Sequence, residues 1–397
     1  MPLMYKRLLV CLDNSDHSNS AAALSVTIAS ATRARLIGCH VYAARLHNAR
    51  FIEMEDGLPP EYQKEEELKN TREVHDTLIT KGLRIISDSY TAVFHARAAS
   101  AGVEPVCVSR EGRNFEEILA EADEQGCDLV SLGRLGLGIV PTSSIGSVAE
   151  RVARRAKQDV LIAGTTDNEG PILTAIDGSP ASFAGLKTAI GLSKVFNRPI
   201  EAIAAFDPIF HQSAFRSIAG VLTEEAGRLF RFNEQEKLHE EIIDKGLARI
   251  YKGHLDTAAA VASSSGAMIK TTLLSGKASD EIIKYAEKIS AFMVVFGRTG
   301  MQATPMLDIG STAENCMREL SCHVLISSGE FIPENAHAPS DPSAIDWTDE
   351  AKAILERIPK FARTIVRNMV EDSARQKGIP IVSASFMREV RKRMEGK

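Results

Sequence analysis

Cysteines are few in this chain, and they do not cluster. The six cysteines are scattered along the sequence, at Cys11, Cys39, Cys107, Cys127, Cys316 and Cys322. Because none of them forms a C-x-x-C pair, neither a disulfide framework nor a structural zinc site is expected. We expect reduced thiols that act as small core residues, and hence a cytoplasmic protein.

Long apolar runs and a surplus of positive charge are also missing. No run reaches the roughly 18 residues that a membrane-spanning helix needs. The formal net charge is −5, whereas a dedicated nucleic-acid-binding protein carries a basic face. The sequence therefore predicts neither a membrane span nor a nucleic-acid partner.

The motifs of common phosphate-cleaving and acyl-transferring enzymes are absent as well. There is no G-K-[ST] lysine of a P-loop, and no Ser–His–acid arrangement can be read from the sequence. His17 and His40 lie near the site predicted below, and we interpret both as structural histidines. No catalytic residue is predicted.

What the chain does contain is a glycine-rich stretch that occurs twice. Gly133-Arg134-Leu135-Gly136 is followed, after nine residues, by Gly146-Ser147. Gly297-Arg298-Thr299-Gly300 is followed, after nine residues, by Gly310-Ser311. Each copy comes after a short apolar run and before a helical pattern, which is the order strand, loop, helix.

This order suits the binding of a phosphate group. Glycines allow positive φ angles and a close approach of the backbone to an anion. A helix start offers free N–H groups and the positive end of the helix dipole. Ser147 and Ser311 can either cap the helix or donate a hydroxyl group to a phosphate oxygen.

The two glycine stretches belong to a longer internal repeat. Several landmark residues are separated by the same 164 positions, namely Asp13 and Asp177, Gly82 and Gly246, Gly133 and Gly297, and Gly146 and Gly310. We interpret the first two-thirds of the chain as a duplication.

Each half alternates strand-like and helical segments. The strand-like runs of the first half are Lys6–Leu12, Leu36–Tyr42, Val103–Ser109, Asp128–Leu132 and Val160–Ala163. They are mostly continuous apolar runs, as in a parallel sheet that helices cover on both faces. We predict two tandem α/β domains with doubly wound, five-stranded parallel sheets of the Rossmann-like kind, at residues 1–166 and 167–329.

A long helical region follows the second strand of each half, at 44–99 and 208–264. Its acidic stretches, such as Glu65-Glu66-Glu67, indicate solvated helix faces. A regulatory insert is the alternative, and the sequence leaves the role of both regions open.

The last part of the chain has a different amino-acid composition. Prolines and small residues predict a linker at 330–345, followed by a small all-α domain at 346–397. This domain has 12 Lys and Arg against 8 Asp and Glu, a net charge of +4, so the remainder carries −9. We expect it to bind a protein partner or to dock on the body, with a core of Trp347, Ile354, Leu355, Ile358, Phe361, Ile365, Met369 and Phe386.

An aspartate ends the first strand of each half. Strands one and four are neighbours in a doubly wound sheet, so Asp13 should face the Gly133 loop and Asp177 the Gly297 loop. Beside a polyphosphate, such a carboxylate can bind Mg²⁺ or accept a hydrogen bond from a ribose hydroxyl. A helix cap by the aspartate is the structural alternative.

The aspartate and the G-x2-G-x9-G-S loop together resemble the ATP-binding branch of the universal stress protein family. The resemblance covers about residues 5–165 and 170–328. It implies a tandem of two such domains, each with a five-stranded parallel sheet that binds ATP or AMP at the carboxyl ends of its strands.

The resemblance also implies roles for individual residues. Asp13 and Asp177 would contact the ribose or Mg²⁺. The backbone of Val41 would meet the adenine, with Ala205 at the matching place, and Leu132 and Phe296 would line the base pocket. The implied phosphate-binding residues are Gly133, Gly136, Gly146, Ser147, Gly297, Gly300, Gly310 and Ser311. The neighbours that complete the implied sites are Leu12, Ser15, Leu135, Val148, Ile176, Ser179, Thr299 and Thr312.

The second half departs from the family pattern at two places. Phe292 stands where the first half has Asp128, and Ala204-Ala205 stands where the first half has His40-Val41. The second base pocket therefore follows the pattern less closely than its phosphate loop does.

The tail has a separate resemblance, carried by Trp347-Thr348, Ile358-Pro359-Lys360-Phe361 and Gly378-Ile379. It resembles the small helical domain at the C-terminus of the light-independent protochlorophyllide reductase B subunit. Residues 346–397 contain neither cysteine nor histidine, so they cannot ligate a metal cluster. Reductase activity is not implied.

These observations favour an adenine-nucleotide-binding stress or regulatory protein, in which bound nucleotide changes the surface offered to a protein partner. A slow ATPase or phosphotransferase is the first alternative, with Arg134 and Arg298 as the loop cations that could reach a phosphate. A nucleotide-free interaction scaffold is the second. Assembly into a homo-oligomer stays open.

Overall fold

The structure is a computed structural model that divides into two units, residues 1–336 and 337–397, which are treated separately. In the first unit it describes residues 5–138, 143–208, 244–301, 303–304 and 307–333. In the second it describes residues 346–356, 363, 366–367, 370–371, 373–374 and 381–394.

The first half of the first unit contains five parallel strands. They are β1 (Arg7–Cys11), β2 (Arg35–Tyr42), β3 (Val106–Glu111), β4 (Leu129–Gly133) and β5 (Asp159–Ala163), in the spatial order β3-β2-β1-β4-β5. The helices between them are α1 (Asp16–Thr32), α2 (Ala44–Glu53), α3 (Glu65–Ser100), α4 (Asn114–Glu124) and α5 (Ser147–Arg155). The order reverses next to β1, as it does in a doubly wound sheet.

The second half repeats this order. Its strands are β6 (Ile172–Ala175), β7 (Ile200–Phe206), β8 (Ile269–Ser275), β9 (Met293–Gly297) and β10 (His323–Ser327). Its helices in the described part are α6 (Pro180–Phe196), α10 (Asp244–Ser264), α11 (Ala278–Lys288) and α12 (Ser311–Glu319). Both halves thus confirm the predicted fold class, a tandem of five-stranded α/β domains.

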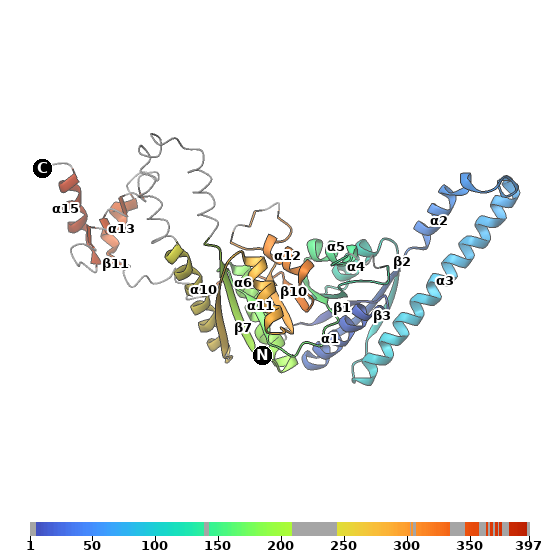
Figure 1. The fold of residues 1–397 in the computed structure, drawn as a ribbon, viewed down its shortest axis with the longest axis horizontal. Coiled ribbons are helices and arrows are strands. Elements are labelled where there is room, and N and C mark those ends of the chain that lie inside the picture. The colour runs from blue at the N-terminus through green and yellow to red at the C-terminus, as the bar shows by residue number, and fades with distance from the viewer. Residues whose placement is uncertain are drawn as a thin grey trace. The chain divides into compact units, whose positions relative to one another are not determined.

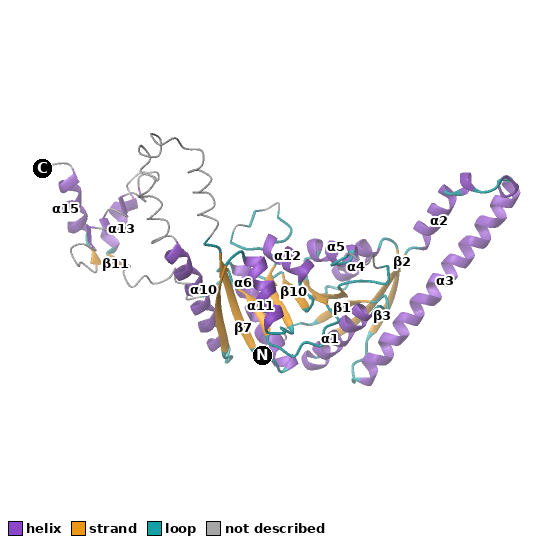
Figure 2. Cartoon of the chain, viewed as in Figure 1, coloured by secondary structure: helices purple, strands orange, loops and turns teal. Residues whose placement is uncertain are grey.

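The two sheets join into one, which the sequence did not predict. β5 and β10 pair antiparallel, with Leu161 opposite Leu325, and the resulting sheet has ten strands in the order β3-β2-β1-β4-β5-β10-β9-β6-β7-β8. Figure 2 shows these strands with helices on both faces of the sheet. The halves therefore share a continuous backbone hydrogen-bond network.

Burial explains the continuous apolar runs of the strands. Successive residues of β1, such as Leu8, Leu9 and Val10, are fully buried. Leu9 belongs to the apolar cluster on one face of the sheet, and Leu8 and Val10 belong to the cluster on the other. Alternating side chains point to opposite faces, so only a sheet covered on both sides buries all three.

The long helical region of the first half forms the α2–α3 hairpin, which extends beyond the edge of the sheet (Figure 1). The C-terminal part of α3 packs on the body through Phe94 and Ala98. Val74, Leu78 and Ile85 are exposed by 61%, 67% and 68%. The predicted helical region of the second half is described only from Asp244 on, and its earlier part lies outside the described residues.

The second unit contains α13 (Asp349–Glu356) and α15 (Ala384–Met394). A short parallel strand pair, β11 (Asp346–Trp347) with β12 (Ile381–Val382), accompanies them and was not predicted. Trp347 and Phe386 lie in its apolar core, and Ile354 and Leu355 pack against it, as expected. The other expected core residues, Ile358, Phe361, Ile365 and Met369, lie outside the described residues.

Within the described part of the chain, no helix combines the length and apolar character needed to cross a lipid bilayer.

Candidate functional site

The first aspartate and the first glycine loop meet at the carboxyl edge of the sheet. β1 pairs with β4, so the residues that follow these strands are neighbours. A Cβ atom placed on Gly136 would lie 2.6 Å from Oδ2 of Asp13. In the second half, a Cβ atom on Gly300 would lie 2.6 Å from Oδ2 of Asp177. The expected pairing of acid and loop is therefore present twice.

The loop glycines are needed for close approach and not for unusual backbone angles. A Cβ atom on Gly133 would lie 2.6 Å from the backbone N of Ser18, and one on Gly297 would lie 2.5 Å from the carbonyl carbon of Ala181. Among the described residues, no glycine of either loop has a positive φ angle. The close approach that glycine allows is therefore used, for packing helices α1 and α6 against the strand ends, whereas its freedom to adopt positive φ is not used.

Each glycine loop leads into the start of a helix. Gly146 is the N-cap of α5 and Gly310 is the N-cap of α12, and neither helix has a side-chain cap. Ser147 and Ser311 are the first helical residues, so the capping alternative for these serines was wrong. The first N–H groups of each helix have no intrahelical acceptor, and they open toward the cavity together with the serine side chain.

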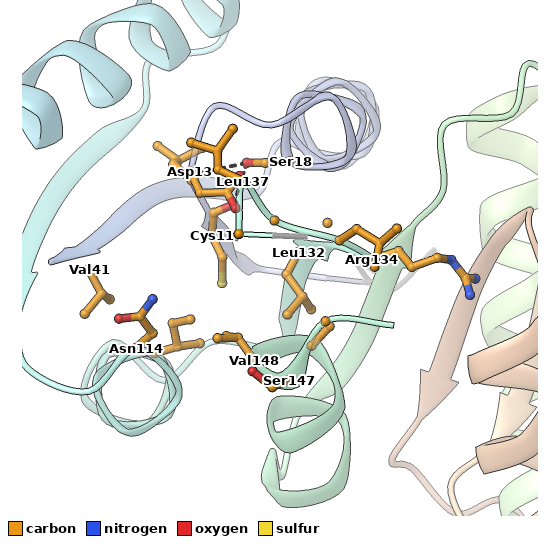
Figure 3. A pocket seen from close by; sticks show the side chains of 18 of the residues that line it. Cys11, Asp13, Ser18, Val41, Asn114, Leu132, Arg134, Leu137, Ser147 and Val148 are labelled. Carbon is orange, nitrogen blue, oxygen red and sulfur yellow. Dashed lines mark hydrogen bonds between the residues drawn. The ribbon is translucent and has the colours of Figure 1, made fainter. Parts of the chain in front are cut away.

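A cavity of about 630 Å³ lies over the first loop (Figure 3). The sequence-predicted residues that line it are Leu12, Asp13, Val41, Leu132, Gly133, Leu135, Gly136, Gly146, Ser147 and Val148. The side chains of Leu132, Ser147 and Val148 come from β4 and α5, and Val41 comes from β2. His40, which was interpreted as a structural histidine near the site, also lines it, and the residues that sequence reasoning missed include Cys11, Asn114, Ile118 and Ile145.

A cavity of about 460 Å³ lies over the second loop. The sequence-predicted residues that line it are Ile176, Asp177, Ala205, Phe296, Gly297, Thr299, Gly300, Gly310, Ser311 and Thr312. Tyr251, Ala278, Ile282, Met301 and Leu307 also line it and were not predicted.

Ser15 and Ser179 do not line these cavities in the described part of the chain. Each is the N-cap of the helix that follows the first strand of its half. The hydroxyl of Ser15 donates to Oδ1 of Asp13 at 2.6 Å, and that of Ser179 donates to Oδ1 of Asp177 at 2.6 Å. These serines hold the aspartates in place, because the carboxylate and the cap share one hydroxyl group.

The loop arginines do not point toward the helix starts at which a phosphate was expected. The buried Arg134 donates to the carbonyl oxygens of Met317 and Cys322 in the other half, at 2.8 and 3.1 Å. Figure 3 shows its side chain running away from the other side chains of the cavity. Arg298 donates to the carbonyl oxygens of Ala153 and Gln158. The hypothesis that these arginines reach a phosphate was therefore wrong.

The histidines near the first loop have different environments. The ring of His17 contacts the carbonyl oxygen of Ala163 at 3.2 Å through Nδ1. His40 lines the cavity and packs edge-on against Tyr90, and its Nδ1 has no partner in the described part of the chain. Burial lowers the pKa of His40, and the nearby charge of Asp13 opposes this effect. A structural role therefore fits His17 well and His40 less well.

The donors around each loop suit an anion with a cation beside it. Backbone N–H groups at the helix start and a serine hydroxyl lie at the loop end of each cavity, with one aspartate among the lining residues. Among the described residues there is no cluster of three or more His, Cys, Asp or Glu that could bind a metal ion alone. A single carboxylate fits Mg²⁺ only if phosphate oxygens and water complete its octahedral shell.

Comparison with known proteins agrees with this geometry. Residues 4–164 and 170–328 each match the universal stress protein family, and residues 347–391 match the family described as proto-chlorophyllide reductase 57 kD subunit. The resemblances to these two families are thereby confirmed.

Individual relatives show the same division. Universal stress protein Rv1636 of Mycobacterium tuberculosis is 30% identical over 162 residues, which is 41% of this chain and 98% of that protein. The light-independent protochlorophyllide reductase of Chlorobium limicola has a B subunit that is 29% identical over 104 residues, which is only 18% of its own length. The reductase likeness thus concerns a small part of that subunit.

Among solved structures, a universal stress protein from Archaeoglobus fulgidus is similar, with a TM-score of 0.51 and 14% identity. The likeness covers 82% of this chain and 97% of that one, and it concerns the fold alone. The two family matches together span most of the chain. The protein therefore belongs to the universal stress protein family, with two copies of the family's domain in one chain.

Proposed function

We propose that the chain binds an adenine nucleotide, ATP or AMP, at the glycine loop of each half and acts as a regulatory module of the stress response. The observation that carries the proposal is the duplicated site, in which an uncapped helix start, a glycine loop and an aspartate surround a cavity. Helix starts of this kind favour phosphate groups. The cavity volumes of about 630 and 460 Å³ fall within the usual range for small-molecule sites, roughly 300–1,000 Å³.

In this proposal the site divides into three parts. The N–H groups at the start of α5 and α12, with Ser147 and Ser311, hold the phosphates. Asp13 and Asp177 lie where they can accept a ribose hydroxyl or help to hold Mg²⁺, which would neutralise phosphate charge. Leu132 and Phe296 offer apolar surface to the base, beside Val41 and Ala205.

We propose that bound nucleotide regulates contacts with a protein partner, and that the helical segment at 346–397 contributes to those contacts. The domain boundaries proposed are 1–166, 167–329 and 346–397, with 330–345 as the linker. The six cysteines are unpaired, which supports a reducing compartment such as the cytoplasm.

A slow ATPase that uses the same loops is the second candidate. The described lining of both cavities contains no lysine, and both loop arginines are bound to the other half. Without a mobile cation beside the transferring phosphate, strong transition-state stabilisation is not expected. These observations favour binding over catalysis.

Mass spectrometry of the small molecules released from the purified protein tests the proposal. We expect an adenine nucleotide in amounts that approach two per chain. If the protein carries no nucleotide and calorimetry shows no ATP binding to the purified chain, the scaffold alternative replaces the proposal.

A further inference from the structure

The two cavities differ at matched positions of the repeat. Asn114 is the first residue of α4, and Ala278, 164 positions later, is the first residue of α11. Both line the cavity of their own half. The first cavity therefore has a side-chain amide where the second has a methyl group.

The amide of Asn114 is free to contact a ligand. The residue is exposed, and its side chain has no hydrogen-bond partner in the described part of the chain. Figure 3 shows its amide pointing from the start of α4 toward Val41. This is the part of the cavity to which the proposed function assigns the base. An amide offers one acceptor and a donor group together, which complements the donor and acceptor edge of adenine.

The second cavity has an aromatic side chain instead. Tyr251 of α10 lines it, and its ring lies 6.5 Å from that of Phe206. The matched residue of the first half, Ser87, is fully buried and donates to the hydroxyl of Ser109 at 2.6 Å. Tyr251 therefore takes up space and offers a flat apolar face in the second cavity, whereas the matched Ser87 does not line the first cavity.

The aspartates differ as well. Oδ2 of Asp177 accepts a hydrogen bond from the backbone N–H of Met301 at 3.1 Å. Oδ2 of Asp13 has no partner within the described ranges, although its Oδ1 accepts the same two bonds from Ser15 as Asp177 accepts from Ser179. The carboxylate of the second half is therefore already used by its own loop, whereas that of the first half retains a free oxygen.

We propose that the two sites have diverged, and that Asn114 is the residue that gives the first site its preference for the polar edge of the base. The second site, with Ala278 and Tyr251, holds a nucleotide through its phosphate loop and through stacking or apolar contact. It does not distinguish bases by their polar groups. This inference rests on the proposed function, because it presupposes that each loop binds a nucleotide.

The test compares ATP with purine riboside triphosphate, which lacks the 6-amino group, by calorimetric titration. The Gly310→Val chain retains only the first site, and the Gly146→Val chain retains only the second. The first site should bind ATP about 3- to 10-fold more tightly than the analogue, the size expected for one hydrogen bond. The second site should bind both ligands equally.

Two further substitutions exchange the matched residues. Asn114→Ala in the Gly310→Val chain should bring the ratio of the two affinities close to one. Ala278→Asn in the Gly146→Val chain should create a preference for ATP. The same two substitutions in the otherwise unchanged chain give a second measurement that does not depend on the valine variants.

The outcomes separate the two levels of the proposal. Triphosphate binding with a ratio that Asn114→Ala leaves unchanged, or an equal preference in both sites, overturns the assignment of Asn114 and leaves nucleotide binding intact. Absence of triphosphate binding in the unchanged chain overturns the proposed function itself.

Discussion

Arg134 and Arg298 occupy matched positions of the repeat, and the side chain of each donates hydrogen bonds to the opposite half of the tandem. Arg134 donates to carbonyl oxygens at the C-terminal end of α12 and in the turn to β10. Arg298 donates to carbonyl oxygens at the end of α5 and in the turn to β5. Two ion pairs also cross between the halves and join matched positions, Glu150 with Arg318 and Arg154 with Glu314.

The arginine contacts should contribute to the stability of the joined halves. Arg134→Met removes the donors of three carbonyl oxygens across the junction, those of Met317, Arg318 and Cys322. Leaving buried acceptors unpaired should lower the free energy of unfolding by about 2–4 kcal/mol. Urea unfolding measures this value. The control is Arg113→Met, which removes an exposed ion pair with Glu116 and should change stability by less than ~1 kcal/mol. Equal effects of the two substitutions would contradict this role.

His323 should make stability depend on pH. Burial, with the charges of Arg134 and Arg198, lowers its pKa from 6.5 to about 4, and its Nδ1 accepts from the N–H of Gly164 at 3.2 Å. As pH falls from 6.5 to 4, His323 becomes protonated in the unfolded chain but stays largely neutral in the folded chain. The stabilisation present above pH 6.5 is therefore lost progressively, by about 3 kcal/mol in total.

His323→Asn is the matched variant, because the amide oxygen can accept the same hydrogen bond without titrating. Urea unfolding of both chains between pH 4 and 7 measures the difference. Asp159, at the matched position, is partly buried, and desolvation raises its pKa, so its effect on stability has the opposite sign. Because both chains contain Asp159, its contribution to the free energy of unfolding cancels when the two are compared. A difference that stays constant with pH would exclude the assigned role of His323.

Hydrolysis of ATP should be slow. We expect no more than roughly a few turnovers per hour, since the described cavity linings offer no lysine and the loop arginines are held by the other half. A phosphate-release assay on the purified chain with Mg²⁺ measures the rate. A rate in the range of kinases, about 1–100 s⁻¹, would favour the enzyme alternative.

The sequence predicted the features that depend on local pattern and on topology. Because Asp13 follows β1 and Gly133 ends β4, the doubly wound order alone brings them together. Repetition at a constant spacing then located the second site. The pairing of β5 with β10 was beyond prediction, because no local pattern in an apolar strand specifies which other edge it will join.

The errors of prediction concern a long side chain, Arg134, and a position at which the two halves differ, Asn114. Arg134 follows a loop glycine, but its side chain is long enough to reach the other half, so its sequence position does not fix its partner. Asn114 went unnoticed because Ala278 replaces it in the second half, and a search for repeated residues passes over such a position. A comparison of the two halves at positions where they differ would have found it.

The C-terminal segment should be dispensable for nucleotide binding. Residues 337–397 form a compact unit of their own. The described lining of both cavities comes from residues before 314. Truncation after residue 340 should leave the ATP affinity of both halves within about 2-fold, a difference smaller than that of one hydrogen bond. Calorimetry on the truncated chain checks this. Loss of folding or of nucleotide would show that the proposed boundary is wrong.

The central claim is that the glycine loops bind nucleotide, and calorimetric titration of the Gly146→Val/Gly310→Val chain with ATP tests it most directly. A Cβ atom on Gly146 would already lie 3.2 Å from the carbonyl oxygen of Arg134, so the larger side chain of valine should displace the loop backbone that is proposed to hold the phosphate. The control is Gly82→Val/Gly246→Val, a second matched pair with nothing within 4 Å of the added Cβ. We predict that the control chain binds ATP as the unchanged chain does and that the loop variant does not bind it. ATP affinity that is unchanged in a folded loop variant would contradict the account.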